Sequence, residues 1–310
     1  MSTNLTSFKI NLFSNQKIQL SKKYFLEIRE ELLRKKSAQI LDIFFFNCID
    51  ILNVKEFIEC GAHEASASKR LSKKGVKAIA IEANPITFNK LTLPDSNKVQ
   101  CFNIGLGDSE KEISFYIPKD DVMAANATFQ PKEFDNYENK KIKVKKLDDL
   151  LNDCKFGSHP GALWIDVEGY QRQVLDGSKN YLKNPNLLIV KIELEQNPVF
   201  KGQSTSEIID DKFKSFGFEL IFCDDQGGYQ FNAVYIRKTS IDLIAQNLEK
   251  VVLELNRYNP NLIKILNIFF KKLTLLSFFK KKAITIFGEK NGNKLCAFLG
   301  SKVSQQKEEN

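Results

Sequence analysis

The feature that most constrains the fold is a series of short apolar runs through residues 54–237, most of them separated by stretches of helical length. Runs of this kind predict strands, and the periodic, charged stretches between them predict helices. The predicted strands are Val54–Cys60, Lys77–Glu82, Val99–Ile104, Ala162–Val167, Leu187–Leu194, Phe218–Cys223 and Phe231–Arg237. The predicted helices are Ala67–Lys74, Pro85–Thr92, Tyr170–Leu182 and Ser206–Phe216. Strands that alternate with helices indicate a parallel sheet covered by helices on both faces.

The last two predicted strands flank Asp224–Gly228, a turn-rich loop that is too short for a crossover helix. They must therefore pair antiparallel. Five parallel strands followed by a hairpin predict a Rossmann-like α/β fold with a doubly wound, mostly parallel seven-stranded sheet. This is the arrangement typical of class I methyltransferases.

Changes in pattern divide the chain into three regions. Helical spacing of apolar residues predicts a helical N-terminal extension over residues 1–50. The sheet domain covers residues 51–238 and includes an insertion at residues 112–156, in which Glu112–Ile117 and Lys141–Lys145 are expected to be strands. Residues 239–310 are predicted to form a basic, helical C-terminal extension, which starts with an amphipathic pattern at residues 241–257.

The charge and cysteine content exclude several classes of function. The net charge of +8 favours anionic partners in general, but a solvated lysine-rich surface also explains it, and we expect no nucleic-acid partner. The six cysteines form no C-x-x-C pair, so we predict neither a metal cluster nor a disulfide framework, and a reducing, cytoplasmic location. No secretory signal is recognisable in residues 1–20, and no apolar run reaches the roughly 18 residues of a membrane-spanning helix.

One segment of the C-terminal extension is unusual. Residues 262–287 combine apolar clusters with six lysines and contain no acidic residue. A basic amphipathic segment of this kind can make peripheral contact with an anionic membrane. The alternative, which we favour, is a helical pair that packs on the sheet domain or on a second subunit of a homo-oligomer.

The first candidate site lies where the strand ending in Glu59-Cys60 turns on Gly61. A strand, a tight turn and a helix start allow a nucleotide-like ligand to approach the backbone. Glu82 ends the next strand, about 20 residues later, where such folds place an acid that holds ribose hydroxyls. The carboxylates and the missing G-x-G-x-x-G pattern disfavour a pyrophosphate and point to S-adenosylmethionine, which is cationic and carries a ribose diol. For Glu82, the structural alternative is an interaction with the start of the helix at Pro85.

Two further motifs follow later strands. Gly105-Leu106-Gly107-Asp108 is either a loop whose backbone approaches an adenine ring or an ordinary turn, and by itself we would favour the turn. Asp166 and Glu168 end another strand, at the edge where open α/β sheets bind ligands. Strand periodicity places both carboxylates on one side, where they can bind an amine, orient a hydroxyl or act as a general base. The alternative is that they cap the helix at Tyr170.

Together these motifs resemble the FkbM-type methyltransferases from Phe57 to about Lys238. The matching stretches are Glu59-Cys60-Gly61-Ala62, Ile81-Glu82-Ala83-Asn84-Pro85, Gly105-Leu106-Gly107-Asp108, Lys146-Leu147-Asp148-Asp149-Leu150, Ile165-Asp166-Val167-Glu168-Gly169, Val174-Leu175-Asp176-Gly177 and Ile192-Glu193. The resemblance implies S-adenosylmethionine as the methyl donor and O-methylation of a sugar, a glycan or another small natural product. The cofactor-binding residues that it implies are Glu59, Gly61, Ala62, Glu82, Ala83, Gly107, Asp108 and Asp166.

The glycine loop departs from the family pattern, which usually reads D-V-G-A-N-x-G. Glu59, His63 and Ala65 replace the acid, the Asn and the last Gly. Ala65 adds a methyl group where the backbone is expected to near the cofactor. His63 either serves as a base beside the cofactor or stabilises the turn.

We therefore predict an S-adenosylmethionine-dependent O-methyltransferase. Glu82 is expected to hold the ribose, Glu59 and Gly61 the methionine end, and Asp108 the adenine side. The catalytic candidates are Asp166, Glu168 and His63, which can accept the proton of the acceptor hydroxyl. The altered glycine loop motivates a rival hypothesis, a non-catalytic scaffold with this fold, and the C-terminal extension motivates another, a membrane-peripheral glycan-assembly factor.

Overall fold

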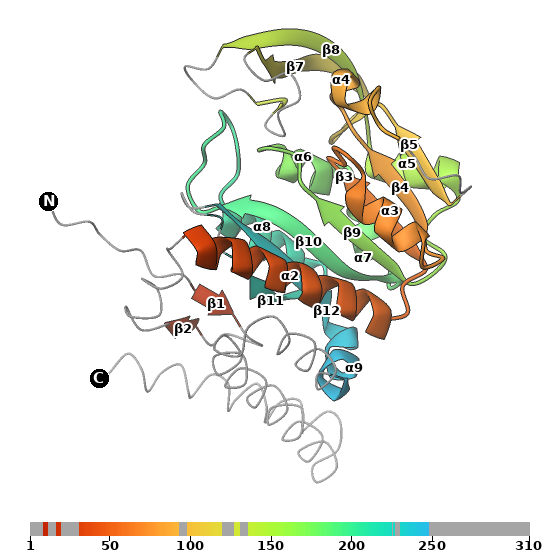
Figure 1. Cartoon of the computed structure of the whole chain (residues 1–310), viewed down its shortest axis with the longest axis vertical. Coiled ribbons are helices and arrows are strands. Elements are labelled where there is room, and N and C mark those ends of the chain that lie inside the picture. The colour runs from red at the N-terminus through yellow and green to blue at the C-terminus, as the bar shows by residue number, and fades with distance from the viewer. Residues whose placement is uncertain are drawn as a thin grey trace, which may run out of the picture.

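The computed structural model describes residues 9–11, 17–19, 31–92, 98–119, 127–130, 136–224, 226 and 230–247 (Figure 1). Within these residues, a seven-stranded sheet lies between two layers of helices. A smaller three-stranded sheet stands beyond one end of the central strands. The predicted α/β fold is confirmed.

The central sheet has the strand order β11-β12-β10-β9-β3-β4-β5. Its strands are β3 (Glu56–Cys60), β4 (Lys77–Ile81), β5 (Val99–Phe102), β9 (Gly161–Ile165), β10 (Leu187–Glu195), β11 (Phe218–Cys223) and β12 (Gln230–Arg237). The strands from β5 to β10 are parallel, whereas β12 pairs antiparallel with both β10 and β11. The terminal hairpin was predicted correctly. Its return strand, β12, lies between β10 and β11, so β11 becomes the edge of the sheet.

One face of this sheet is covered by α2 (Glu31–Ile51), α3 (Ser66–Ser72) and α9 (Ile241–Gln246). The apolar stripe of α2 explains this packing, because Leu41, Phe44 and Phe45 are all buried. Phe45 meets the ring of Trp164 on β9 edge to face, with the ring centroids 5.7 Å apart. These contacts anchor α2 across the middle of the sheet.

The opposite face is covered by α5 (Leu147–Cys154), α6 (Gln171–Asp176), α7 (Lys179–Lys183) and α8 (Ser206–Ser215). The predicted helix over residues 170–182 is in fact two helices, α6 and α7, that break at Gly177. A Cβ atom on Gly177 would lie only 1.8 Å from the carbonyl oxygen of Gly107, so this position must be glycine. Glycine is unfavourable inside a helix, which suits a break here. Asp148 on α5 then accepts the backbone N–H groups of Asn180 and Tyr181 at the start of α7.

The insertion forms the smaller sheet, in the order β6-β8-β7. Its strands are β6 (Gly105–Leu106), β7 (Lys111–Pro118) and β8 (Tyr137–Lys145), and both strands predicted for the insertion are present. Thr128, in the connection between β7 and β8, forms a bridge with Tyr116. The short helix α4 (Pro85–Phe88) follows β4 and replaces the longer helix predicted over residues 85–92. These elements rise above the carboxyl ends of the central strands (Figure 1).

The terminal extensions are only partly described. The predicted N-terminal helical extension contains α2, but it also contains an antiparallel hairpin of β1 (Lys9–Asn11) and β2 (Lys17–Gln19), so it is not helical throughout. Both short strands alternate polar and apolar residues, which suits an extended backbone. After β12 the chain continues through a 3₁₀ turn, η1 (Lys238–Ser240), into α9, and the basic segment at residues 262–287 lies outside the described residues. Among the described residues, none of the helices has the length and apolar character that crossing a membrane requires.

Candidate active site

A pocket opens at the carboxyl ends of β3, β4 and β9. From β3 the chain first builds β4 and β5 on one side and later β9 and β10 on the other, so this is the point at which the sheet order reverses. Open α/β sheets bind ligands at such points. The pocket's empty space of about 680 Å³ includes open solvent at the mouth.

Gly61 forms the floor of the pocket and must be glycine. Its φ is +77°, and a Cβ atom would lie 1.6 Å from the carbonyl oxygen of Asp166. Its backbone N–H donates to the carbonyl of Ile81 at 2.9 Å, which ties the turn to the end of β4. Because Gly61 has no side chain, the ends of β3 and β9 can meet beneath the ligand space.

Glu82 follows β4 and lines the pocket, as the sequence predicted. One carboxylate oxygen accepts the backbone N–H of His63 at 2.7 Å, and the other accepts that of Asn84, also at 2.7 Å. Burial raises the pKa of Glu82, and these two N–H donors oppose the shift. The two N–H donors hold the carboxylate in place. Each of its oxygens can accept more than one hydrogen bond, so Glu82 can still accept hydroxyl groups of a ligand. Asn84, and not Glu82, caps α4, by accepting the N–H of Ile86.

Glu59 is a buried carboxylate on β3 that lies outside the pocket lining. Its oxygens accept the backbone N–H groups of Ser68 at 2.9 Å and Ala67 at 3.4 Å, at the start of α3. A carboxylate is favourable at a helix N-terminus, where N–H groups lack partners within the helix. The Glu59 side chain was expected to contact the cofactor. In the structure its carboxylate binds the start of α3 and does not line the pocket.

The altered residues of the glycine loop take left-handed backbone conformations. His63 has φ +46° and lines the pocket, whereas Ala65 has φ +53° and packs into the hydrophobic core. Asn and Gly adopt this region at low cost, which explains why the family pattern has them here. The methyl group of Ala65 therefore lies in the core and outside the pocket lining. Ala62 is buried and donates its N–H to the carbonyl of Ile81, while Ala83 lines the pocket.

The loop after β5 lines the pocket, but not with the two residues that were expected to bind the cofactor. Gly105 and Leu106 line the pocket, but Gly107 and Asp108 do not. Asp108 is exposed and pairs with Lys111 at 2.7 Å, and this partner lowers the pKa of its carboxyl group. Asp108 thus stabilises the turn before β7. This agrees with the alternative given above, that the motif is an ordinary turn.

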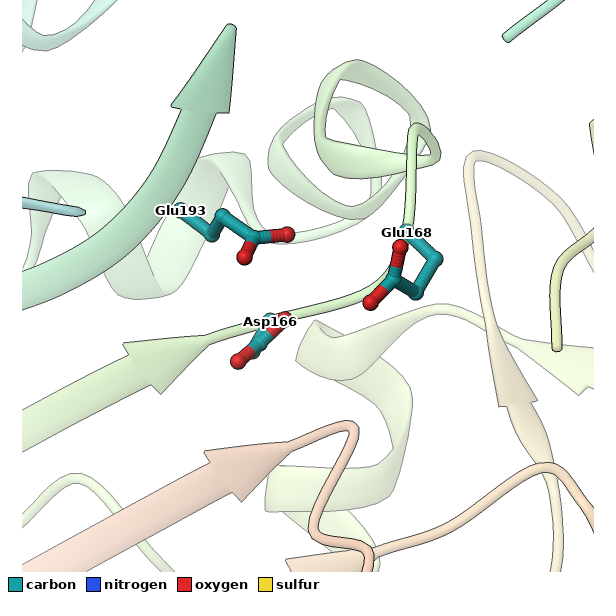
Figure 2. Close-up of side chains that lie close together, drawn as sticks. All are labelled: Asp166, Glu168 and Glu193. Atoms are coloured by element: carbon teal, nitrogen blue, oxygen red, sulfur yellow. The ribbon is translucent and has the colours of Figure 1, made fainter. Parts of the chain in front are cut away.

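Asp166 and Glu168 both line the pocket, and the structure adds a third carboxylate beside them (Figure 2). Glu193 reaches over from β10, and one oxygen from each of the three side chains lies within 4.8 Å of the others. Glu168 is placed by a left-handed backbone, with φ +45°, and its carbonyl accepts the hydroxyl of Thr128 at 2.5 Å. Thr128 belongs to the insertion, so the smaller sheet fixes one wall of this acidic group.

Electrostatics disfavour three ionised carboxylates at such short range. Burial raises the pKa of Asp166, although Lys191 opposes the shift. Burial and the neighbouring carboxylates Asp166, Glu168 and Glu195 raise the pKa of Glu193 well above its usual value. A carboxylate with a raised pKa is a better proton acceptor, which suits a general base.

An aromatic wall lines part of the pocket. The rings of Phe115 and Phe129 lie 4.7 Å apart, and those of Phe129 and Tyr170 lie 5.0 Å apart. All three line the pocket, and two of them come from the insertion. The sequence analysis missed this wall. Its signal was the alternation in Glu112–Ile117, which turns Phe115 and Ile117 toward the same buried side.

Comparison with known proteins shows similarity to methyltransferases. The chain is 31% identical over 122 residues to the hexuronic acid methyltransferase AglP of Haloferax volcanii. The matched stretch covers 38% of this chain and 48% of that protein, so the chain spans about half the length of the curated relative.

Two solved structures show low overall similarity. One is magnesium protoporphyrin IX methyltransferase from Synechocystis PCC 6803 with bound SAM, which has a TM-score of 0.37 and 9% identity and covers 70% of this chain and 92% of its own. The other is 1,6-didemethyltoxoflavin-N1-methyltransferase from Burkholderia thailandensis with S-adenosylhomocysteine, which has a TM-score of 0.31 and 10% identity and covers 70% and 82%.

The family model gives the assignment. The methyltransferase FkbM domain matches residues 59–220, just over half of the chain, from Glu59 before the glycine turn to Leu220 in β11. This span contains Gly61, Glu82 and the three clustered carboxylates, and it begins and ends within the central sheet. The protein therefore belongs to the FkbM methyltransferase domain family.

Proposed function

We propose that this protein is an S-adenosylmethionine-dependent O-methyltransferase whose acceptor is a hydroxyl group of a sugar, a glycan or another small natural product. The observation that carries the proposal is Glu82, a buried carboxylate fixed by two backbone N–H groups at the wall of a pocket. The relative from Haloferax volcanii, which is described as a hexuronic acid methyltransferase, supports a sugar acceptor.

The residues of the pocket suit this cofactor. Glu82 offers acceptor oxygens of the kind that hold a ribose diol, and Gly61 allows the backbone to approach the ligand closely. The backbone of Gly105 and the aromatic side chains of Phe115 and Phe129 offer an apolar surface for a purine ring. Asp166 and Glu168 give the remaining wall, on which the acceptor hydroxyl is expected to lie, a negative charge.

When bound, S-adenosylmethionine supplies a methyl group that its sulfonium already activates. The protein's part is to align the acceptor hydroxyl, to exclude water and to take up the hydroxyl proton. Asp166, Glu168 and His63 all line the pocket and can serve as the proton acceptor. Among them we favour Asp166, because burial raises the pKa of its carboxyl group.

Calorimetric titration with S-adenosylmethionine tests the proposal. Glu82→Gln should weaken binding by at least about tenfold, because it removes the charge and one acceptor toward the ribose. Glu59→Gln is the matched control, since Glu59 is equally buried and also binds backbone N–H groups, but lies outside the pocket. Saturable binding by the control but not by Glu82→Gln supports the site. No saturable heat with the unmodified protein would favour the scaffold hypothesis, and equal losses in both variants would contradict the role of Glu82.

A further inference from the structure

The acidic group at the ends of β9 and β10 is built differently from the other carboxylates of the pocket. One oxygen from each of Asp166, Glu168 and Glu193 lies within 4.8 Å of the other two, and Figure 2 shows the three side chains close together. In an octahedral site, oxygen ligands of Ca²⁺ at about 2.4 Å from the ion lie at most about 4.8 Å apart, and those of Mg²⁺ at about 2.1 Å lie at most about 4.2 Å apart. The three oxygens are therefore close enough to reach one hard cation, and a small ion draws them slightly closer together.

Glu193 supplies an independent sign that a ligand belongs there. The residue is only 7% exposed, and one carboxylate oxygen, Oε1, accepts the side-chain N–H of Gln230 at 2.6 Å. The other oxygen, Oε2, is buried and has no hydrogen-bond donor among the described residues. Burying a carboxylate oxygen without a partner is costly. It therefore requires a proton shared with Asp166, or a cation.

A shared proton neutralises less of the negative charge of the three carboxylates than a divalent cation does. A shared proton neutralises one of the three carboxylates, while Glu195, two residues beyond Glu193, adds further negative charge to the same strand. The nearest buried lysine, Lys191, is already engaged with Asp42 at 2.6 Å and lies over the Trp164 ring. A divalent cation neutralises two charges and also gives Oε2 of Glu193 a partner.

The elements that carry the three carboxylates are rigid. Asp166 directly follows β9, and Glu193 lies near the end of the neighbouring parallel strand β10. Each comes one residue after the paired residues Ile165 and Ile192. The turn that carries Glu168 is held by the hydroxyl of Thr128, and a Cβ atom on Gly169 would lie 2.7 Å from the ring of Phe200. Ligands on strand ends and on a packed turn keep their spacing, which a metal site requires.

We propose that Asp166, Glu168 and Glu193 bind one hard divalent cation of the Mg²⁺, Mn²⁺ and Ca²⁺ class at the acceptor side of the pocket. Carboxylate oxygens without any nitrogen or sulfur ligand favour such ions over Zn²⁺. Asp166 and Glu168 line the pocket, so the open coordination positions face the acceptor. There the cation can bind a hydroxyl, lower its pKa and hold it in line for methylation. This last role rests on the proposed function, whereas cation binding does not.

Titration with Mn²⁺, followed by the loss of the electron paramagnetic resonance signal of the free ion, tests the site directly. The full chain is first stripped with EDTA, and neither cofactor nor acceptor is added. We expect one Mn²⁺ per chain, displaced by Mg²⁺, and a loss of affinity of at least about tenfold in Glu193→Gln. Glu195→Gln is the matched control, because it removes a buried charge from the same strand outside the cluster and should retain the affinity.

Failure of either outcome overturns the proposal. One such failure is the absence of Mn²⁺ binding up to about 10 mM, which is beyond the weakest physiological cation sites. The other is an unchanged affinity in Glu193→Gln. If Glu193→Gln does not fold, as judged by circular dichroism, the half-buried Glu168→Gln serves in its place, because Thr128 binds its backbone and not its side chain. Cofactor calorimetry without metal remains a separate measurement, so the proposed function and the cation site can fail independently.

Discussion

The carboxylates at the two halves of the pocket edge differ in their hydrogen-bond donors. At the ends of β3 and β4, Glu59 and Glu82 each accept two backbone N–H groups. At the ends of β9 and β10, carboxylate faces carboxylate, and Oε2 of Glu193 has no donor among the described residues. The carboxylates of the first half have N–H donors within the protein, whereas those of the second need a shared proton or a cation. This difference separates carboxylates that the backbone holds in place from carboxylates whose charges are left facing one another.

The glycine turn that joins the two halves should be the most sensitive point. In Gly61→Ala the new methyl group would overlap the carbonyl of Asp166, and the backbone is left-handed. We expect a loss of more than about 3 kcal/mol in the free energy of unfolding, or no folding at all. Urea denaturation measures this loss in the free energy of unfolding. Gly75→Ala is the control, because its φ is +91° but only the end of the Lys98 side chain is near, so it should lose only about 1 kcal/mol. Similar losses in both variants would show that the close approach is not what requires glycine.

The acidic half predicts a stabilising substitution. Without divalent cations at neutral pH, Glu193→Gln should raise the free energy of unfolding by about 1–2 kcal/mol, because it removes one of several buried like charges. Glu59→Gln, whose carboxylate already has N–H donors, should not stabilise the protein. Denaturation in EDTA measures both variants. A destabilised Glu193→Gln under these conditions would contradict the contrast between the two halves.

The same half predicts the pH dependence of stability. Folding raises the pKa of Glu193, so the folded protein keeps this proton to a higher pH than the unfolded chain does. Its contribution is fully present below the unfolded pKa of about 4.3 and is lost as the pH rises through the folded pKa. In EDTA, the fall in stability with rising pH should thus be shallower for Glu193→Gln than for the unmodified protein. Identical pH profiles from thermal denaturation would contradict the assigned pKa shift.

The smallest effect is expected in the glycine loop. Ala65→Gly relieves a left-handed alanine, which is worth about 1–2 kcal/mol, but it also removes a buried methyl group worth about 0.8 kcal/mol. These terms nearly cancel, so stability should change by less than about 1 kcal/mol. Cofactor affinity should not change, because Ala65 lies outside the pocket lining. Calorimetry that found markedly tighter binding in Ala65→Gly would restore the idea that its methyl group crowds the cofactor.

The architecture could be predicted well from the sequence because the two patterns that define it are local. Apolar runs at helical separations define a parallel sheet, and a short polar loop defines the terminal hairpin. Gly61, Glu82, Asp166 and Glu168 could be found in the same way, since each follows directly from a predicted strand end. All four line the pocket.

The rest depends on which segments meet in space. Glu193 joins Asp166 only because β10 lies beside β9, which the linear pattern does not state. Glu59 was expected to face the ligand, but the N–H groups at the start of α3 draw its carboxylate away. Asp108 pairs with Lys111, three residues later, and this local signal was available in the sequence. The helix breaks at Gly177, whose close approach to the distant Gly107 helical periodicity alone could not reveal.

The central claim is that one half of the pocket holds the cofactor and the other half holds a cation and the acceptor. A crystal structure with S-adenosylhomocysteine and Mn²⁺, with anomalous diffraction data to locate the metal, tests it most directly. The account predicts ribose hydroxyl groups on Glu82 and an anomalous peak between Asp166, Glu168 and Glu193. A ligand bound away from Glu82, or a Mn²⁺ peak elsewhere with none among the three carboxylates, would contradict it.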